Sequence, residues 1–153
     1  MKKYFHFILL IISIYSCGNK SKLKETNEFK KYLNENHSVS IVDEGLYFII
    51  PMNICSYCTK STIKKLLSLE NTKKIKIILT DFTKINFEEP SKKLNAYSIL
   101  KDSRMHISKE TSFFSGEYPL ILQIKNNSIV KIMKIDVNEN DDEIDDFLDD
   151  FFR

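Results

Sequence analysis

Two kinds of apolar pattern follow one another along the first half of the chain. Residues 46–50 and 74–80 read LYFII and KIKIILT, and such short, nearly continuous apolar runs are typical of strands buried on both faces. Between them, residues 55–70 carry apolar side chains at helical spacing and lysines on the opposite side. The pattern therefore predicts a βαβ unit, in which a crossover helix joins two parallel strands. The apolar side of this helix is formed by Cys58, Ile63, Leu66, Leu67 and Leu69.

Two weaker patterns flank this unit. Residues 39–42 include three β-branched residues before a turn signal and predict an additional N-terminal strand at the border of the domain. Residues 90–100 begin with proline and place Leu94 and Tyr97 on one side, which predicts a second helix.

The last third of the chain predicts a hairpin and a helix. Two alternating runs, residues 118–124 and 129–135, flank an Asn-rich turn, as in a β-hairpin. Residues 140–152 have the spacing of an amphipathic helix, and Asn140 with Glu143 forms a capping-box arrangement at its start. The predicted element order is β-α-β-α-β-β-α, which is an α/β fold.

The N-terminus has the features of an export signal. A short positive start precedes an apolar stretch at residues 4–14, which is shorter than the ~20 residues that a membrane-spanning helix needs. Residues 14–17, Ile-Tyr-Ser-Cys, resemble a bacterial lipobox. The resemblance implies that residues 1–16 are a lipoprotein signal peptide and that Cys17 is lipidated and becomes the mature N-terminus. An ordinary secretory signal with an incidental cysteine is the alternative.

The segment after Cys17 predicts a membrane tether. Residues 17–36 are polar and lysine-rich, as in a flexible linker, although Leu23, Phe29, Tyr32 and Leu33 are spaced so that they could line one side of a short helix. A folded domain would then span residues 37–153. No acidic residue follows Cys17 directly. By similarity to lipoprotein sorting signals, we expect attachment to the bacterial outer membrane facing the periplasm, with surface display left open.

Composition narrows the class of partner. The 153 residues are 42% hydrophobic with only three glycines and three prolines, which suits one packed domain. Removing Lys2 and Lys3 with the signal leaves 21 of the 23 basic residues, equal to the 21 acidic ones. A nearly neutral mature chain gives no reason to expect nucleic acid as a partner.

The chemistry-bearing feature is the pair Cys55 and Cys58, a C-x-x-C sequence between a predicted strand and a predicted helix. This placement indicates redox function. A cysteine at a helix N-terminus meets the positive end of the helix dipole and free backbone N–H groups. Both favour the thiolate and lower the thiol pKa below about 8.5. The thiolate is the form that attacks a disulfide.

The cysteine pair, the element order and Tyr118-Pro119 at the opening of the hairpin together resemble the thioredoxin family. The resemblance covers roughly residues 40–153 and implies a central mixed sheet flanked by helices, with a cis-proline beside the cysteine pair. The strand at residues 46–50 lacks the buried carboxylate that is usual in this family, and Asp81 and Glu44 are poor substitutes for it on sequence grounds.

The resemblance also implies roles for individual residues. Cys55 would be the nucleophile and Cys58 the resolving cysteine, while the substrate would contact Ser56, Tyr57, Tyr118 and Pro119. No cofactor is implied beyond a redox-active Cys55–Cys58 disulfide. The partners would be thiols or disulfides of exported proteins, the membrane through the lipid on Cys17, and a membrane electron donor. The function expected is that of a membrane-anchored thiol–disulfide oxidoreductase.

Three other functions are alternatives to this one. The first is a non-enzymatic thioredoxin-like binding lipoprotein with a static Cys55–Cys58 disulfide. The second is a zinc site, which needs three or four N/S ligands, whereas the cysteine pair offers two and His37 and His106 are isolated in sequence; no metal is expected. The third is a hydrolase set of Ser112, Ser115 and Asp102, which no nucleophile-elbow motif supports.

Overall fold

The computed structural model describes residues 2–53, 56–69, 72–81, 92–136 and 140–153, with side chains from Lys20 onward except that of Ser56. Predicted features at Ile54, Cys55 and Pro90 lie outside these residues. The elements are α1 (Lys2–His37), β1 (Glu44–Pro51), α2 (Ser56–Ser68), the 3₁₀ turn η1 (Thr72–Lys74), β2 (Ile75–Thr80), β3 (Ser98–Asp102), α4 (His106–Glu110), β4 (Leu120–Lys125), β5 (Ser128–Lys134) and α5 (Asp141–Phe152).

The strands form one five-stranded mixed sheet in the order β3-β2-β1-β4-β5. Strands β1, β2 and β3 are parallel, whereas β4 is antiparallel to β1 and β5 is antiparallel to β4. The α/β fold class and the central mixed sheet are therefore confirmed. The predicted βαβ unit is also confirmed, because α2 connects the parallel neighbours β1 and β2.

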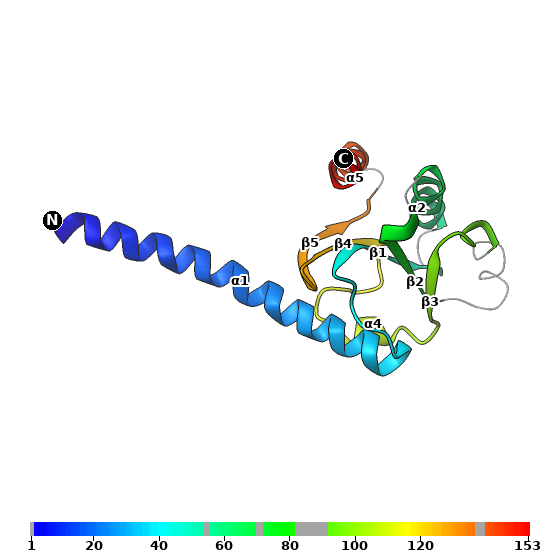
Figure 1. Ribbon diagram of the computed structural model, residues 1–153, viewed down its shortest axis with the longest axis horizontal. Coiled ribbons are helices and arrows are strands. Elements are labelled where there is room, and N and C mark those ends of the chain that lie inside the picture. Colours follow the sequence, from blue (N-terminus) through cyan, green and yellow to red (C-terminus); the bar gives the residue numbers. More distant parts are fainter. Residues whose placement is uncertain (1, 54–55, 70–71, 82–91, 137–139) are drawn as a thin grey trace.

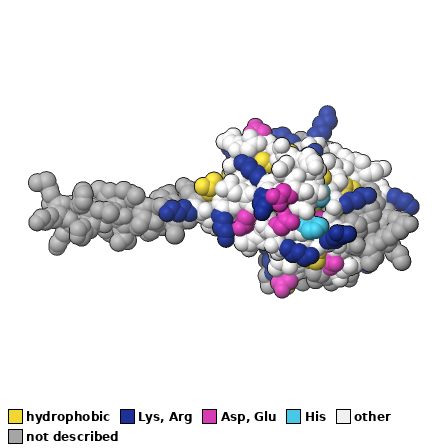
Figure 2. Space-filling model, turned by 90° about the horizontal axis from the view of Figure 1, so that it is seen from below, with side chains coloured by type: hydrophobic (Ala, Val, Ile, Leu, Met, Phe, Trp, Pro, Cys, Tyr) yellow, Lys and Arg dark blue, Asp and Glu magenta, His cyan; other side chains and the backbone are white. Residues whose placement is uncertain are grey.

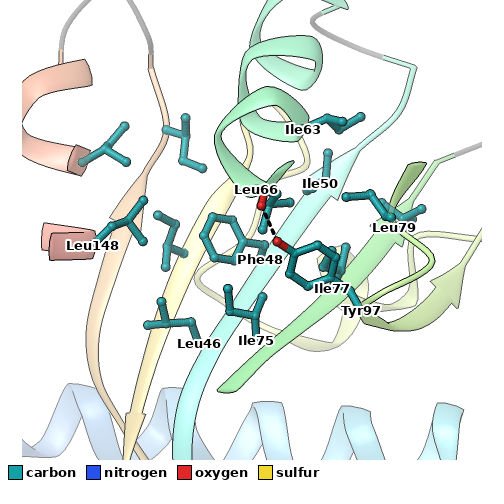
Figure 3. Close-up of a cluster of buried hydrophobic side chains, with 14 of the residues drawn as sticks. Leu46, Phe48, Ile50, Ile63, Leu66, Ile75, Ile77, Leu79, Tyr97 and Leu148 are labelled. Carbon is teal, nitrogen blue, oxygen red and sulfur yellow. Dashed lines mark hydrogen bonds between the residues drawn. The ribbon is translucent and has the colours of Figure 1, made fainter. Parts of the chain in front are cut away.

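Helices cover both faces of the sheet (Figure 1). Alternate residues of a strand point to opposite faces, and on β1 both sets are apolar and buried. Leu46, Phe48 and Ile50 belong to the core under α2 and α5, which Figure 3 shows in close-up. Tyr47 and Ile49 belong to the second core, which α1 and α4 cover. Burial on both faces explains why the strand reads as a continuous apolar run.

The C-terminal part of α1 corrects the expectation of a flexible tether for residues 26–36, which pack on the domain. Its C-terminal part lies against the sheet, while its N-terminal part extends away from it (Figure 1). Phe29, Tyr32 and Leu33 are completely buried in the second core. The segment is polar on one side only, and its few apolar residues are enough for one side of a helix to pack. Among the described residues, no helix is both long enough and apolar enough to cross a membrane.

The edge strand β3 is the second correction. Residues 39–42 form no strand, and residues 98–100, predicted as the end of a helix, belong to β3. Leu94 and Tyr97 are buried as predicted, but a turn closed by the Tyr97 N–H on the Leu94 carbonyl, at 3.0 Å, brings them together. The Tyr97 hydroxyl also donates to the Leu66 carbonyl in α2 (Figure 3). The three-residue spacing of Leu94 and Tyr97 therefore reflects a turn and not a helix.

The C-terminal predictions are confirmed except for one cap. Asn126 and Asn127 have φ of 52° and 55°, as a two-residue hairpin turn between β4 and β5 requires. Helix α5 buries Ile144 and Leu148. The Asn140 side chain does not cap this helix. It accepts from the Asp136 N–H at 3.0 Å and donates to the Lys134 carbonyl at 2.7 Å, so it holds the chain between β5 and α5 and forms no capping box.

Candidate functional site

The cysteine motif lies where β1 ends and α2 begins. Cys58 is in the first turn of α2, is only 4% exposed and is disulfide-bonded. Tyr57 is 65% exposed, so the motif presents a buried sulfur and an outward aromatic ring. Cys55, the predicted nucleophile, and the Ser56 side chain lie outside the described part of the chain.

Two buried threonines hold the first turns of α2 in place. The Thr59 hydroxyl donates to the Pro51 carbonyl at 2.8 Å, which ties the helix to the last residue of β1. The Thr62 hydroxyl donates to the Cys58 carbonyl, also at 2.8 Å. Both side chains are buried, where an unpaired hydroxyl would be costly. These bonds fix the backbone that carries Cys58.

The loop before Cys55 is anchored to the end of β2. The Met52 N–H donates to the Thr80 carbonyl at 2.9 Å. The Asn53 side chain donates to Asp81 Oδ1 at 3.3 Å. Asp81 is therefore the carboxylate that the fold brings to this loop, because β1 itself carries none from Leu46 to Pro51.

Strand register brings Tyr118 and Pro119 to the same end of the sheet. Strand β4 starts at Leu120, which pairs with Ile49, two residues before the end of β1. Pro119 is buried, and its carbonyl accepts from the Ile135 N–H at 2.8 Å. The cis bond expected from the family resemblance is not formed, because the described residues contain no cis peptide bond and the Tyr118-Pro119 bond is among them.

A buried carboxylate lies at this end of the sheet on the α1–α4 face. Asp102 pairs in register with Thr80, which pairs with Pro51. Its side chain is 1% exposed. The carboxylate accepts from the N–H groups of His106 and Ile107, each at 2.9 Å, and so binds the first turn of α4.

The same carboxylate joins two histidines that are far apart in sequence. His106 Nδ1 lies 3.2 Å from Asp102 Oδ1, and the Tyr32 hydroxyl lies 3.2 Å from Oδ2 and 2.8 Å from His37 Nε2. Burial, and then Asp102, raises the pKa of Tyr32. Burial lowers the pKa of His37, although Asp102 opposes the shift. Figure 2 shows histidine side chains at the surface among acidic and basic ones.

The sequence alone shows these histidines as isolated, because they come together only through the way α1 crosses the sheet. The one local signal for the cluster is an aspartate shortly before a short helix. Among the described residues, no three His, Cys, Asp or Glu side chains come together as a metal ligand set would. The Ser112 hydroxyl donates to Glu28 at 2.8 Å, so it forms no hydrolase set with Asp102.

Comparison with protein-family models, with curated proteins and with solved structures finds no match. The structure itself defines the class: an α/β protein with a five-stranded mixed sheet flanked by helices, in which Cys58 lies in the first turn of the helix after the central strand.

Proposed function

We propose that this chain is a thioredoxin-like thiol–disulfide oxidoreductase that acts on exported proteins. One observation carries most of the proposal: a disulfide-bonded, buried Cys58 in the first turn of α2, with Tyr118-Pro119 at the same end of the sheet. Ligands of open α/β sheets bind outside the carboxyl ends of the parallel strands, and this is the end at which both features lie.

The burial of Cys58 supports the roles proposed within the pair. Because residue Cys58 is only 4% exposed, a disulfide of another protein would reach it poorly, and Cys58 suits an internal attack. The external attack is left to Cys55. The Cys55 thiolate would attack a substrate disulfide, forming a mixed disulfide and releasing one substrate thiolate.

The second step completes the transfer of two electrons from the cysteine pair to the substrate. The Cys58 thiolate attacks Cys55 Sγ, breaks the mixed disulfide and releases the second substrate thiol. The Cys55–Cys58 pair is then oxidised by two electrons and the substrate is reduced by two. The reverse sequence oxidises a substrate dithiol. Repeated reduction needs a membrane-bound dithiol donor, and the lipid on Cys17 would hold the protein near it, on the outer membrane facing the periplasm.

A trapping experiment tests the proposal. In cells that express the Cys58→Ser chain, mixed disulfides through Cys55 should accumulate as adducts that dithiothreitol releases. The Cys55→Ser/Cys58→Ser chain is the matched control and should form none. Absence of releasable adducts on the Cys58→Ser chain would count against exchange.

One observation favours a second function, a non-enzymatic binding lipoprotein with a static disulfide. The stretch of β1 from Leu46 to Pro51 is buried and carries no carboxylate, so the strand that leads to the motif supplies no acidic group for proton transfer to Cys58. A chain with this function would give no adducts in the trapping experiment and would keep its partner when both cysteines are replaced.

A further inference from the structure

A small hollow adjoins Tyr118. Its volume is ≈ 260 Å³, below the about 300–1,000 Å³ of small-molecule sites. It is therefore sized for one side chain of a larger partner. Its lining comes from the segment between α4 and β4, from the start of β4 and from the end of β5, namely Phe113, Phe114, Ser115, Glu117, Tyr118, Leu120 and Lys134.

The walls of the hollow are fixed by contacts with their surroundings. Lys134 Nζ lies 3.4 Å from the centroid of the Tyr118 ring and 3.6 Å from Asp136 Oδ2. The Phe113 ring packs edge-on against Phe29 of α1, with centroids 6.0 Å apart. A preformed wall reduces the conformational entropy that a ligand must overcome on binding.

Glycine 116 brings a second loop against this segment. Its φ is +87°, and an added Cβ would lie 2.3 Å from the Met105 side chain. The positive φ favours glycine at this position, whereas the contact is with the terminal methyl of Met105, which can move. The segment that carries Phe113–Tyr118 is thereby packed against the loop before α4.

The lining combines an apolar base with an acidic rim. Phe114 is 3% exposed and Leu120 is 7% exposed, so they offer an apolar surface. Glu117 is exposed and its carboxylate has no partner among the described residues. The positive charge of Lys134 is already engaged by Tyr118 and Asp136. The charged group of the lining that remains available to a ligand is therefore the Glu117 carboxylate.

We propose that this hollow selects the polypeptide substrate: it takes an apolar side chain of an extended segment, while Glu117 faces a basic side chain of the same segment. The inference rests on the proposed function. Tyr118, which lines the hollow, precedes the start of β4 at the end of the sheet where the cysteine motif lies. In an extended chain, side chains two residues apart lie on one side and about 6.6–6.8 Å apart. The hollow lies on the α1–α4 side of this end of the sheet, whereas α2, which carries Cys58, covers the other side, so the substrate segment would cross the end of the sheet between them.

Binding is measured first, with peptides in which serine replaces the reactive cysteine. One fluorescent peptide carries leucine and lysine near the serine, and its partner carries serine and aspartate at those positions. We expect the first to bind about tenfold more tightly, because its leucine would be buried in the hollow and its lysine would face Glu117. Glu117→Gln should weaken its binding about two- to fivefold, the range of an exposed charge pair, and Glu117→Lys should favour the aspartate peptide.

The control is Glu44→Gln, at the opposite end of β1, where the carboxylate is 54% exposed and paired with Lys74. It should leave both affinities unchanged. Equal affinity of the two peptides for the unaltered protein, or equal effects of Glu44→Gln and Glu117→Gln, would overturn the proposal.

Exchange is measured next, with disulfide forms of the same peptides and with a small aromatic disulfide. Exchange with the small disulfide but no preference between peptides overturns the selectivity of the hollow and leaves the proposed function standing. Peptide preference without exchange overturns the oxidoreductase and leaves a polypeptide-binding hollow. Loss of both overturns both.

Discussion

Asp102 is the residue at which the polar contacts of the α1–α4 face converge. Three hydrogen bonds from two helices, with His106 Nδ1 a further 3.2 Å contact, surround a carboxylate that is almost completely buried. Burying a charged carboxylate is costly unless it is hydrogen-bonded, and here each bond also joins β3 to another element. The residue therefore stabilises a contact between parts of the chain that are distant in sequence.

His37 makes stability depend on pH at this contact. Burial holds the pKa of His37 below its ordinary value of 6.5, Asp102 opposes the shift, and His106 reinforces it. The other charged group of α4 nearby is Glu110, which accepts from Asn36 at 2.9 Å. The pKa of His37 is lower in the folded chain than in the unfolded chain. Its contribution to the free energy of unfolding is therefore full above about pH 6.5 and is lost as pH falls through the lowered value.

We therefore predict that the free energy of unfolding falls more steeply between about pH 7 and pH 5 in the unaltered chain than in His37→Gln. Urea unfolding at a series of pH values measures both slopes. Parallel slopes would show that His37 titrates alike in the folded and unfolded chains.

Among the elements, α2 and α5 are joined by one lysine. Lys65 Nζ lies 3.0 Å from Asp141 Oδ1 and also contacts Asp145, while its own side chain is 14% exposed. Burial disfavours the charge of Lys65, but the hydrogen bonds that it donates to Asp145 and Asp141 outweigh this effect and raise its pKa above 10.5. The stabilisation is therefore full below about pH 10.5 and is lost as pH rises beyond the raised value.

Lys65→Met should lower the free energy of unfolding by about 1 kcal/mol at neutral pH, because the two aspartates are half-exposed. The loss should shrink in about 1 M salt, where the screening length is about 3 Å. Lys64→Met, on an exposed position of the same helix, is the control and should change stability little. An equal loss in both variants would assign the effect to helix composition instead.

Helix α1 makes a stronger prediction, because it supplies part of the core. A chain that starts at residue 20 retains Phe29, Tyr32 and Leu33, which are fully buried, whereas a chain that starts at residue 38 lacks them. We expect the shorter chain to lose cooperative thermal unfolding and to bind a hydrophobic dye, since each lost large side chain costs about 2–5 kcal/mol. Cooperative unfolding at the same temperature in both chains would restore the interpretation of this segment as a tether.

The elements that could be predicted are those specified by nearby residues. Strands β1 and β2 are predicted by their short, continuous apolar runs. The hairpin is predicted by Asn126-Asn127, where both residues adopt the positive φ that the turn needs. Strand β3 was missed because Leu94 and Tyr97 have helical spacing in a turn. The sequence of α1 predicts a tether because its three buried residues are surrounded in sequence by many polar ones. Whether they pack depends on contact with the sheet, which the local sequence does not show.

At the scale of the whole molecule, one end of the sheet gathers the chemistry. Pro51, Thr80 and Asp102 are paired across three parallel strands. Pro119 directly precedes β4, whose first residue pairs with Ile49 near the same end of β1. The cysteine motif and Tyr118-Pro119 could be predicted for this end, because each opens or follows a strand. The histidine–aspartate contact and the hollow beside Tyr118 could not, because α1, α4 and β5 contribute to them from distant parts of the sequence.

The central claim is that Cys55 and Cys58 form a reversible redox couple. The direct measurement equilibrates the Cys17→Ser chain in thiol–disulfide buffers and counts free thiols by alkylation and mass. The account predicts that two thiols appear together, in one two-electron transition between roughly −270 and −120 mV. A pair that stays oxidised below about −300 mV, as structural disulfides do, or thiols that appear independently of one another, would contradict it.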